Sequence, residues 1–187
     1  MSFLPTFFAT AGLLSLSTSA ALGKSGAEKS AKFTLTTTAF HDQGEIPVQY
    51  TGDGQNISPP LQWSGEPHNT RAFALLVDDP DAPSPKPWVH WVIYDIPANV
   101  HQLPEGVPTR ATLDQPKDVE QGVNSRHTIG YEGPQPPKGH GWHHYHFKLY
   151  ALDQRIDLQP GASKEQLLKA MKNHVLAETE IVGRFSH

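Results

Sequence analysis

The sequence has 187 residues, of which 37% are hydrophobic, and its formal net charge is −4. A chain of this length can form one domain with a substantial core. Its 15 basic residues are spread along the chain without forming a basic stripe, which argues against nucleic-acid binding. Cysteine is absent, which excludes disulfides, a cysteine nucleophile, cysteine zinc ligands and lipid attachment to an N-terminal cysteine.

The first 23 residues contain no Asp, Glu, Lys or Arg, and an apolar run extends from Phe7 to Leu16. This run is shorter than the ~20 residues that span a bilayer. Its length and the small residues after it predict a secretory signal peptide at residues 1–23, although the usual basic residue at its start is missing. An apolar N-terminal segment on a cytoplasmic protein is the alternative. Residues 24–32 form a polar leader, and we expect a periplasmic or secreted protein without a transmembrane anchor in its mature form.

Residues 33–187 are predicted to form a single domain of short strands, because 17 Pro and 15 Gly interrupt the chain at short intervals. Alternation of apolar and polar residues predicts a strand at 33–37, and a second short strand is expected at 48–50 within a loop-like stretch. Continuous apolar character predicts strands covered on both faces at 71–77 and 88–96.

Residues 100–138 show no periodicity and are predicted to form a long surface excursion, of a kind that is usually functional or mobile in compact domains. Strand character returns at 145–152, followed by a short edge strand at 155–158. Ser163 and Gln166 then form a capping box that predicts the start of one helix. The apolar face of this helix is predicted to hold Leu167, Leu168, Met171 and Val175. A strand at 180–185 completes a β-sandwich or barrel-like pair of sheets with a helix near the C-terminus.

One polar residue follows the first of the two most apolar strands, and another lies in the middle of the second. Strand alternation places Asp79 on the face of Phe73, Leu75 and Val77, where a carboxylate is costly unless it meets a donor. The same alternation places His90 on one face with Trp88, Val92 and Tyr94. A solvated Asp-Pro turn and a structural core histidine are the alternatives for these two residues.

The third polar group is the histidine-rich strand that follows Gly141. His143 and Tyr145 are expected to point one way, and His144 and His146 the other. His143 and Tyr145 can therefore converge with His90 and Asp79 at one end of a sheet. Imidazole and phenol donors suit a phosphate monoanion or another small oxyanion, with Asp79 orienting a histidine and favouring its protonated form. Asp81 is expected either to bind a cationic headgroup or to hold the turn.

Taken together, these motifs resemble the phosphatidylethanolamine-binding protein family, in particular its bacterial branch of Raf-kinase-inhibitor-like proteins. They are Asp79-Pro80-Asp81-Ala82-Pro83, His90-Trp91, and Gly133-Pro134-Gln135-Pro136-Pro137-Lys138-Gly139 leading to His143-His144-Tyr145. The similarity runs in order from about Phe33 to Phe185. It implies a two-sheet antiparallel β-sandwich with a C-terminal helix, and a pocket for phosphate-like anions or phospholipid headgroups. The pocket residues that it implies are Asp79, Asp81, His90, Pro137, His143 and Tyr145.

Two positions depart from the family pattern. Ser84-Pro85-Lys86 stands where eukaryotic members have Ser-Arg, which puts a kinase-regulating surface of the eukaryotic kind in doubt. His144 stands where relatives commonly have Arg, which removes a fixed positive charge from the rim of the pocket.

These features favour a non-enzymatic protein that binds a small anion or phospholipid headgroup. A regulatory or inhibitory role is compatible with such binding. No nucleophile elbow or phosphate-cradling loop motif is present, so we assign no catalytic residue and expect no cofactor, metal or nucleic acid. One alternative is a protein-interaction module that inhibits a protease or kinase through residues 100–138, with an unknown protein target. The other is a metal-dependent hydrolase, which is disfavoured because His143 and His144 face opposite ways and no His-Glu-x-x-His helix exists.

Overall fold

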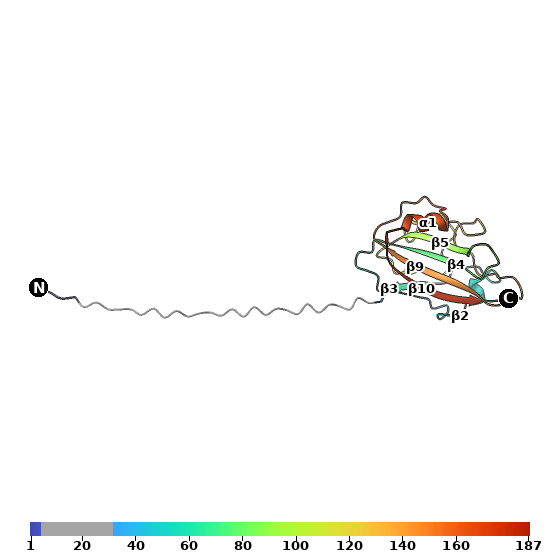
Figure 1. The fold of residues 1–187 in the computed structure, drawn as a ribbon, viewed down its shortest axis with the longest axis horizontal. Coiled ribbons are helices and arrows are strands. Elements are labelled where there is room, and N and C mark those ends of the chain that lie inside the picture. Colours follow the sequence, from blue (N-terminus) through green and yellow to red (C-terminus); the bar gives the residue numbers. More distant parts are fainter. Residues whose placement is uncertain (5–31) are drawn as a thin grey trace.

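The computed structural model describes residues 1–4 and 32–187 of the chain. Most of the predicted signal peptide and polar leader lies outside the described residues. Within the described residues the chain forms two sheets and one α-helix (Figure 1). The small sheet has the order β1 (Thr34–Thr36), β3 (Leu61–Ser64), β6 (Gln102–Leu103). The large sheet has the order β2 (Gly44–Glu45), β10 (Val175–Phe185), β9 (His143–Leu152), β4 (Ala72–Asp79), β5 (Trp88–Pro97), β8 (Val119–Gln121), β7 (Thr112–Leu113).

The main core lies between the two sheets. Phe73 and Phe147 from the large sheet pack there with Leu35 and Trp63 from the small one. The central strands β4 and β9 are buried on their other face as well, because α1 (Lys164–Met171) and the segment before it cover that face. Figure 1 shows α1 beside β5 on this side. Burial from both sides explains why all eight residues of β4 are buried and why its sequence is almost continuously apolar.

The mainly β, two-sheet architecture confirms the predicted fold class, with one correction. All strand pairs are antiparallel except that of β2 with β10, which is parallel over Gly44–Glu45. The large sheet is therefore mixed. The parallel pairing of β2 with β10 was not predictable from a local sequence pattern, because β2 has only two residues.

The predicted capping box is confirmed at the start of α1. The Ser163 hydroxyl accepts from the Gln166 backbone N–H, and the Gln166 side chain accepts from the Ser163 N–H. Leu167 and Met171 are buried under the helix. Val175, predicted on the same helical face, instead begins β10 and is exposed, because the helix ends at Met171.

Three local predictions were wrong. Residues 48–50 form a 3-10 turn, in which the Tyr50 N–H donates to Pro47 O, and not a strand. Residues 155–158 form no strand, since the Ile156 N–H donates to the Asp95 carboxylate. Residues 100–138 are not only a surface excursion: they contain β6, β7 and β8, and their fully buried Gln121 donates to two backbone carbonyls. Hydrogen bonds from side chains to the backbone stabilise this segment, and such bonds leave no periodic pattern of apolar residues in the sequence.

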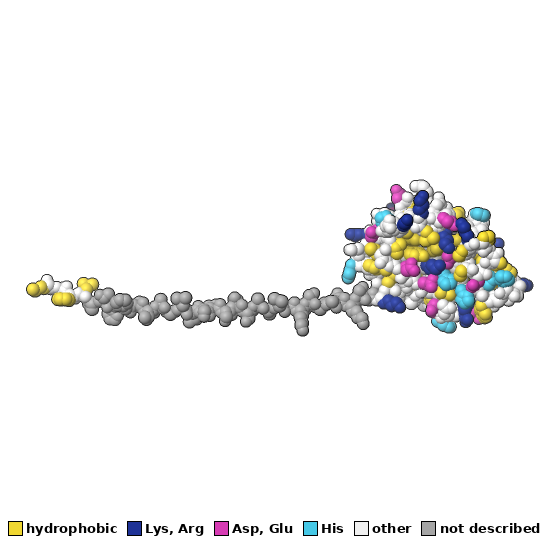
Figure 2. Space-filling view, viewed as in Figure 1, with side chains coloured by type: hydrophobic (Ala, Val, Ile, Leu, Met, Phe, Trp, Pro, Cys, Tyr) yellow, Lys and Arg dark blue, Asp and Glu magenta, His cyan; other side chains and the backbone are white. Residues whose placement is uncertain are grey.

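The described surface carries mixed charge. On the face in Figure 2, Lys and Arg side chains are scattered among Asp, Glu and His. Within residues 1–4 and 32–187, no helix is long and apolar enough to cross a membrane.

Candidate functional site

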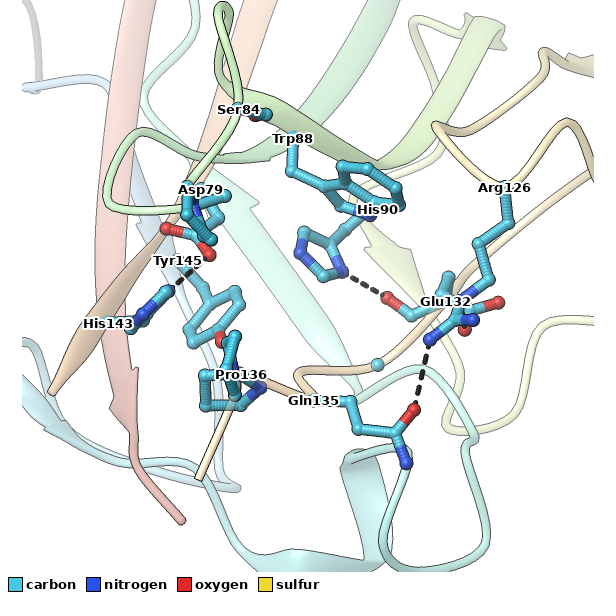
Figure 3. A pocket seen from close by; sticks show the side chains of 14 residues that line it. Asp79, Ser84, Trp88, His90, Arg126, Glu132, Gln135, Pro136, His143 and Tyr145 are labelled. Carbon is cyan, nitrogen blue, oxygen red and sulfur yellow. Dashed lines mark hydrogen bonds and ion pairs between the residues drawn. The ribbon is translucent and has the colours of Figure 1, made fainter. Parts of the chain in front are cut away.

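A cavity of about 260 Å³ opens where β4 ends and where β5 and β9 begin (Figure 3). Five of the six predicted site residues line it: Asp79, His90, Pro137, His143 and Tyr145. They come from three neighbouring strands and from the proline-rich segment before β9. The pairing of β4 with β9 is unbroken from Ala72 to Asp78, so strand alternation correctly predicts that Asp79 and His143 share a face.

The sixth predicted residue, Asp81, does not line the cavity. Its Oδ2 atom accepts from the His144 backbone N–H at 2.9 Å and lies 2.7 Å from His144 Nδ1. Burial alone would raise the pKa of Asp81, but these bonds from His144 lower it below the ordinary value. Asp81 was expected either to bind a cationic headgroup or to hold the turn, and its contacts with His144 match the second role.

Asp79 and His143 form a buried pair on one wall of the cavity. His143 Nδ1 lies 2.8 Å from Asp79 Oδ2, and both side chains are less than 5% exposed. The other carboxylate oxygen, Oδ1, accepts from the Asp81 N–H at 2.8 Å. On its far side, His143 Nε2 lies 3.1 Å from His140 Nδ1. The carboxylate thus fixes the orientation of the imidazole and of the turn after β4.

A bulge in β5 brings His90 into the cavity. Val77 pairs with Trp91 but Asp78 pairs with Val89, which leaves His90 as an extra residue. His90 lines the cavity and packs edge-on against Tyr145, with ring centroids 5.1 Å apart. Val92, by contrast, belongs to the cluster under α1. The predicted sharing of one face by His90 and Val92 was therefore wrong, because strand alternation is interrupted at the bulge.

The protonation state of His90 follows from its surroundings. Nδ1 lies 2.7 Å from Glu132 O, an atom that can only accept, so Nδ1 carries the proton. Burial lowers the pKa of His90 to about 4. The ring is thus neutral at pH 7, and its Nε2 atom offers a lone pair on the side of Asp79 and Tyr145 (Figure 3).

Tyr145 supplies a hydroxyl to the same space. The residue is almost fully buried and lines the cavity, and this hydroxyl forms no hydrogen bond within the described residues. Burial, followed by the nearby Asp79 carboxylate, raises the pKa of Tyr145 well above its ordinary value. The phenol therefore remains a donor at every physiological pH.

A charged pair at the rim was not identified from the sequence. Arg126 Nε lies 2.5 Å from Glu132 Oε1, and its guanidinium also donates to Gln135 Oε1 at 3.0 Å. All three residues line the cavity and lie in the segment predicted as a surface excursion. The only local signal is the nearby proline-rich motif, since nothing in the spacing of Arg126 indicates where it points.

The cavity offers hydrogen-bonding groups without an evident nucleophile and base. The Ser84 hydroxyl, the one serine hydroxyl on its wall, donates to Lys86 O instead of to a histidine. Among residues 1–4 and 32–187, no three His, Asp or Glu side chains are placed to hold a metal ion. The arrangement suits capture of a small polar ligand.

Comparisons with known proteins identify relatives of this chain. The family model for phosphatidylethanolamine-binding protein matches residues 36–186. A UPF0098 protein from Methanothermobacter thermautotrophicus is 52% identical over 151 residues, covering 81% of this chain and 97% of the relative. YbcL from E. coli, solved as a member of the mammalian family, is 33% identical with a TM-score of 0.79, covering 84% of this chain and 99% of that one. The crystal structure of a phosphatidylethanolamine-binding protein homologue from Chlamydia trachomatis is 36% identical with a TM-score of 0.74, covering 83% of this chain and 97% of that one.

Proposed function

The chain belongs to the phosphatidylethanolamine-binding protein family, and on this basis we propose that it is a non-enzymatic binding protein for a small phosphate-bearing ligand. The ligand is either free phosphate, a small phosphorylated molecule or the headgroup of a phospholipid. The binding residues in this proposal are Asp79, His90, Pro137, His143 and Tyr145.

The observation that supports the proposal is the unused hydrogen-bonding capacity of two groups on the cavity wall. Neither Tyr145 Oη nor His90 Nε2 has a protein partner in the described part of the chain, and both belong to side chains that line the cavity. A ligand in the cavity can pair with both groups, whose side chains are already held in place by the surrounding protein. The Arg126 guanidinium at the rim adds N–H donors, and its charge is balanced by the Glu132 carboxylate 2.5 Å away.

The size of the cavity limits the ligand. A volume of about 260 Å³ lies just below the range of ~300–1,000 Å³ that is usual for small-molecule sites. Such a space holds a phosphate group and a few further atoms. The acyl chains of a lipid would have to remain outside.

The alternative of a protease or kinase inhibitor has no comparable support. It depends on residues 100–138, which are exposed over much of their length and are anchored in the main core by Leu103, Leu113 and Val119. No contact in the described residues indicates a protein partner for this surface. For the cellular location, we propose export to the periplasm or the medium, directed by residues 1–23.

Thermal unfolding in the presence of ligand tests the proposal. Inorganic phosphate and phosphoethanolamine should each raise the melting temperature in a saturable way, because they bind only the folded state. Tyr145→Phe removes only the hydroxyl and should weaken this shift. His174→Asn is the matched control, since His174 pairs with Asp153 on the surface and does not line the cavity. A wild-type protein that shows no shift with either ligand would contradict the proposal.

A further inference from the structure

The tautomer of His90 is fixed from two directions. Its Nδ1 atom donates to Glu132 O at 2.7 Å, and the Glu132 backbone N–H donates to His90 O at 2.9 Å. These two hydrogen bonds hold the His90 ring next to the Glu132 carbonyl. Because a carbonyl oxygen cannot donate, Nε2 is the atom that remains unprotonated, and Figure 3 shows it pointing toward Asp79 and Tyr145.

The charged and titratable groups around the imidazole come from each element packed against it. They are Asp79 on β4, Tyr145 on β9, Arg126 and Glu132 on the segment that follows β8, and Asp78 on the opposite face of β4. Burial lowers the pKa of His90 to about 4, although the Glu132 carbonyl and the Asp79 carboxylate act in the opposite direction. The neighbours therefore do not restore a positive charge to this ring at neutral pH.

Two acceptors thus face the same small space: the Nε2 lone pair of His90 and the carboxylate of Asp79. A fully ionised oxyanion offers only acceptors, so at this wall it would place acceptor against acceptor. An oxyanion with one O–H group offers the missing donor.

We propose that the pocket selects an oxyanion that carries a proton, which it donates to Nε2 of His90. The inference rests on the proposed function and narrows it to phosphate and phosphomonoesters, bound as the monoanion. Sulfate has no proton to donate at neutral pH. The phosphate of an intact phospholipid is a diester and has none either; the ammonium of an ethanolamine headgroup is a donor, but two carbons separate it from the phosphate. We therefore expect the preferred ligand to be a soluble phosphomonoester and not a lipid headgroup.

A dependence on pH follows from this selection. The second pKa of a phosphomonoester is ~6, so above that pH the monoanion fraction falls about tenfold per unit. The dissociation constant should therefore rise about tenfold from pH 7 to pH 8. At pH 7.5, where the free ligand is mostly the dianion, each binding event should take up about one proton.

The test is calorimetric titration of the full mature chain at pH 7.5 with two matched pairs of ligands. Inorganic phosphate is compared with sulfate, and methyl phosphate with dimethyl phosphate; glycerophosphoethanolamine stands for the lipid headgroup. Repeating each titration in buffers of different ionisation enthalpy gives the number of protons taken up. We expect phosphate and methyl phosphate to bind about tenfold or more tightly than sulfate and dimethyl phosphate, which have no donor for the His90 Nε2 acceptor. We expect the same advantage over glycerophosphoethanolamine, which has no donor on its phosphate.

Equal affinity within either pair, equally tight binding of glycerophosphoethanolamine, or binding of methyl phosphate without proton uptake, would overturn the inference and leave the proposed function standing. If none of the five ligands binds, the proposed function falls as well.

Substitution of His90 gives a second, independent readout. In His90→Gln the side-chain amide can turn either its oxygen or its nitrogen toward the ligand, so the phosphate-to-sulfate preference should fall toward one. His174→Asn should keep the wild-type preference. An unchanged preference in folded His90→Gln would contradict the role of Nε2. If this variant does not fold, the five-ligand comparison on the wild-type chain still decides.

Discussion

Replacement of Asp79 by Ala is expected to destabilise the protein strongly and to remove ligand binding. The Asp79 carboxylate accepts from His143 at 2.8 Å and from the Asp81 N–H at 2.8 Å, and its side chain is 4% exposed. A hydrogen bond to a charged group is worth ~1.5–3 kcal/mol, and breaking a buried pair costs ~3–5 kcal/mol. We therefore expect a loss of about 3 kcal/mol in the free energy of unfolding.

This loss can be measured by urea denaturation at pH 7.5, where it should lower the midpoint without changing the slope. Asp81→Ala is the matched control two residues away. Its side chain is 41% exposed and paired with a half-exposed His144, so the expected loss is ~0–1 kcal/mol. Asp81→Ala should also keep the stabilisation by phosphate. A loss below about 1 kcal/mol in Asp79→Ala, or equal losses in both variants, would refute the assignment of Asp79 to a buried, structurally required pair.

Three further predictions concern the opposite face of β4, the pH dependence of stability and the N-terminus. Asp78 is 3% exposed and pairs with Lys148 and Lys164, so Asp78→Ala should destabilise the protein by ~2 kcal/mol. This is less than breaking a buried pair usually costs, because both lysines can reach water. Amide hydrogen exchange in α1 should become faster, and unaltered exchange would contradict a role of the Asp78–Lys164 pair in holding α1. Burial lowers the pKa of His90 from its ordinary value of 6.5 to about 4, so its contribution to stability is present above pH 6.5 and is lost as the pH falls toward 4. Urea denaturation at pH 7.5 and 4.5 should show a loss in which His90 accounts for about 2–3 kcal/mol, and the loss should be smaller in His90→Gln; an equal loss in both proteins would contradict it. Expression of the full chain in a bacterium should yield a periplasmic protein that begins near residue 24, whereas an intact Met1 in the cytoplasmic fraction would contradict export.

Patterns within single segments predicted much of the fold. The apolar runs of β4 and β5 are strong because both faces of these strands are buried, whereas the first six residues of β9 alternate between buried and half-buried. The capping box at Ser163 is a local device that does not depend on the remainder of the chain. Regular pairing of β4 with β9 is also the reason why Asp79 and His143 could be placed together from alternation alone.

Features set by contacts between distant segments were not predictable in this way. The bulge at His90 depends on how β5 pairs with β4, and it reverses the face inferred from alternation. Arg126 reaches the cavity through Glu132 and Gln135 in a segment without periodicity. The expectation that a protonated histidine binds the ligand also changes for His90, because burial lowers its pKa and its Nδ1 donates to Glu132 O, a contact that no local pattern indicates.

The most direct test of the central claim is a crystal structure of the protein grown or soaked in saturating inorganic phosphate. We predict tetrahedral density in the cavity, with one phosphate oxygen within hydrogen-bond distance of Tyr145 Oη and another within hydrogen-bond distance of His90 Nε2. Density for water alone in this cavity, at a phosphate concentration that stabilises the protein in solution, would contradict the claim.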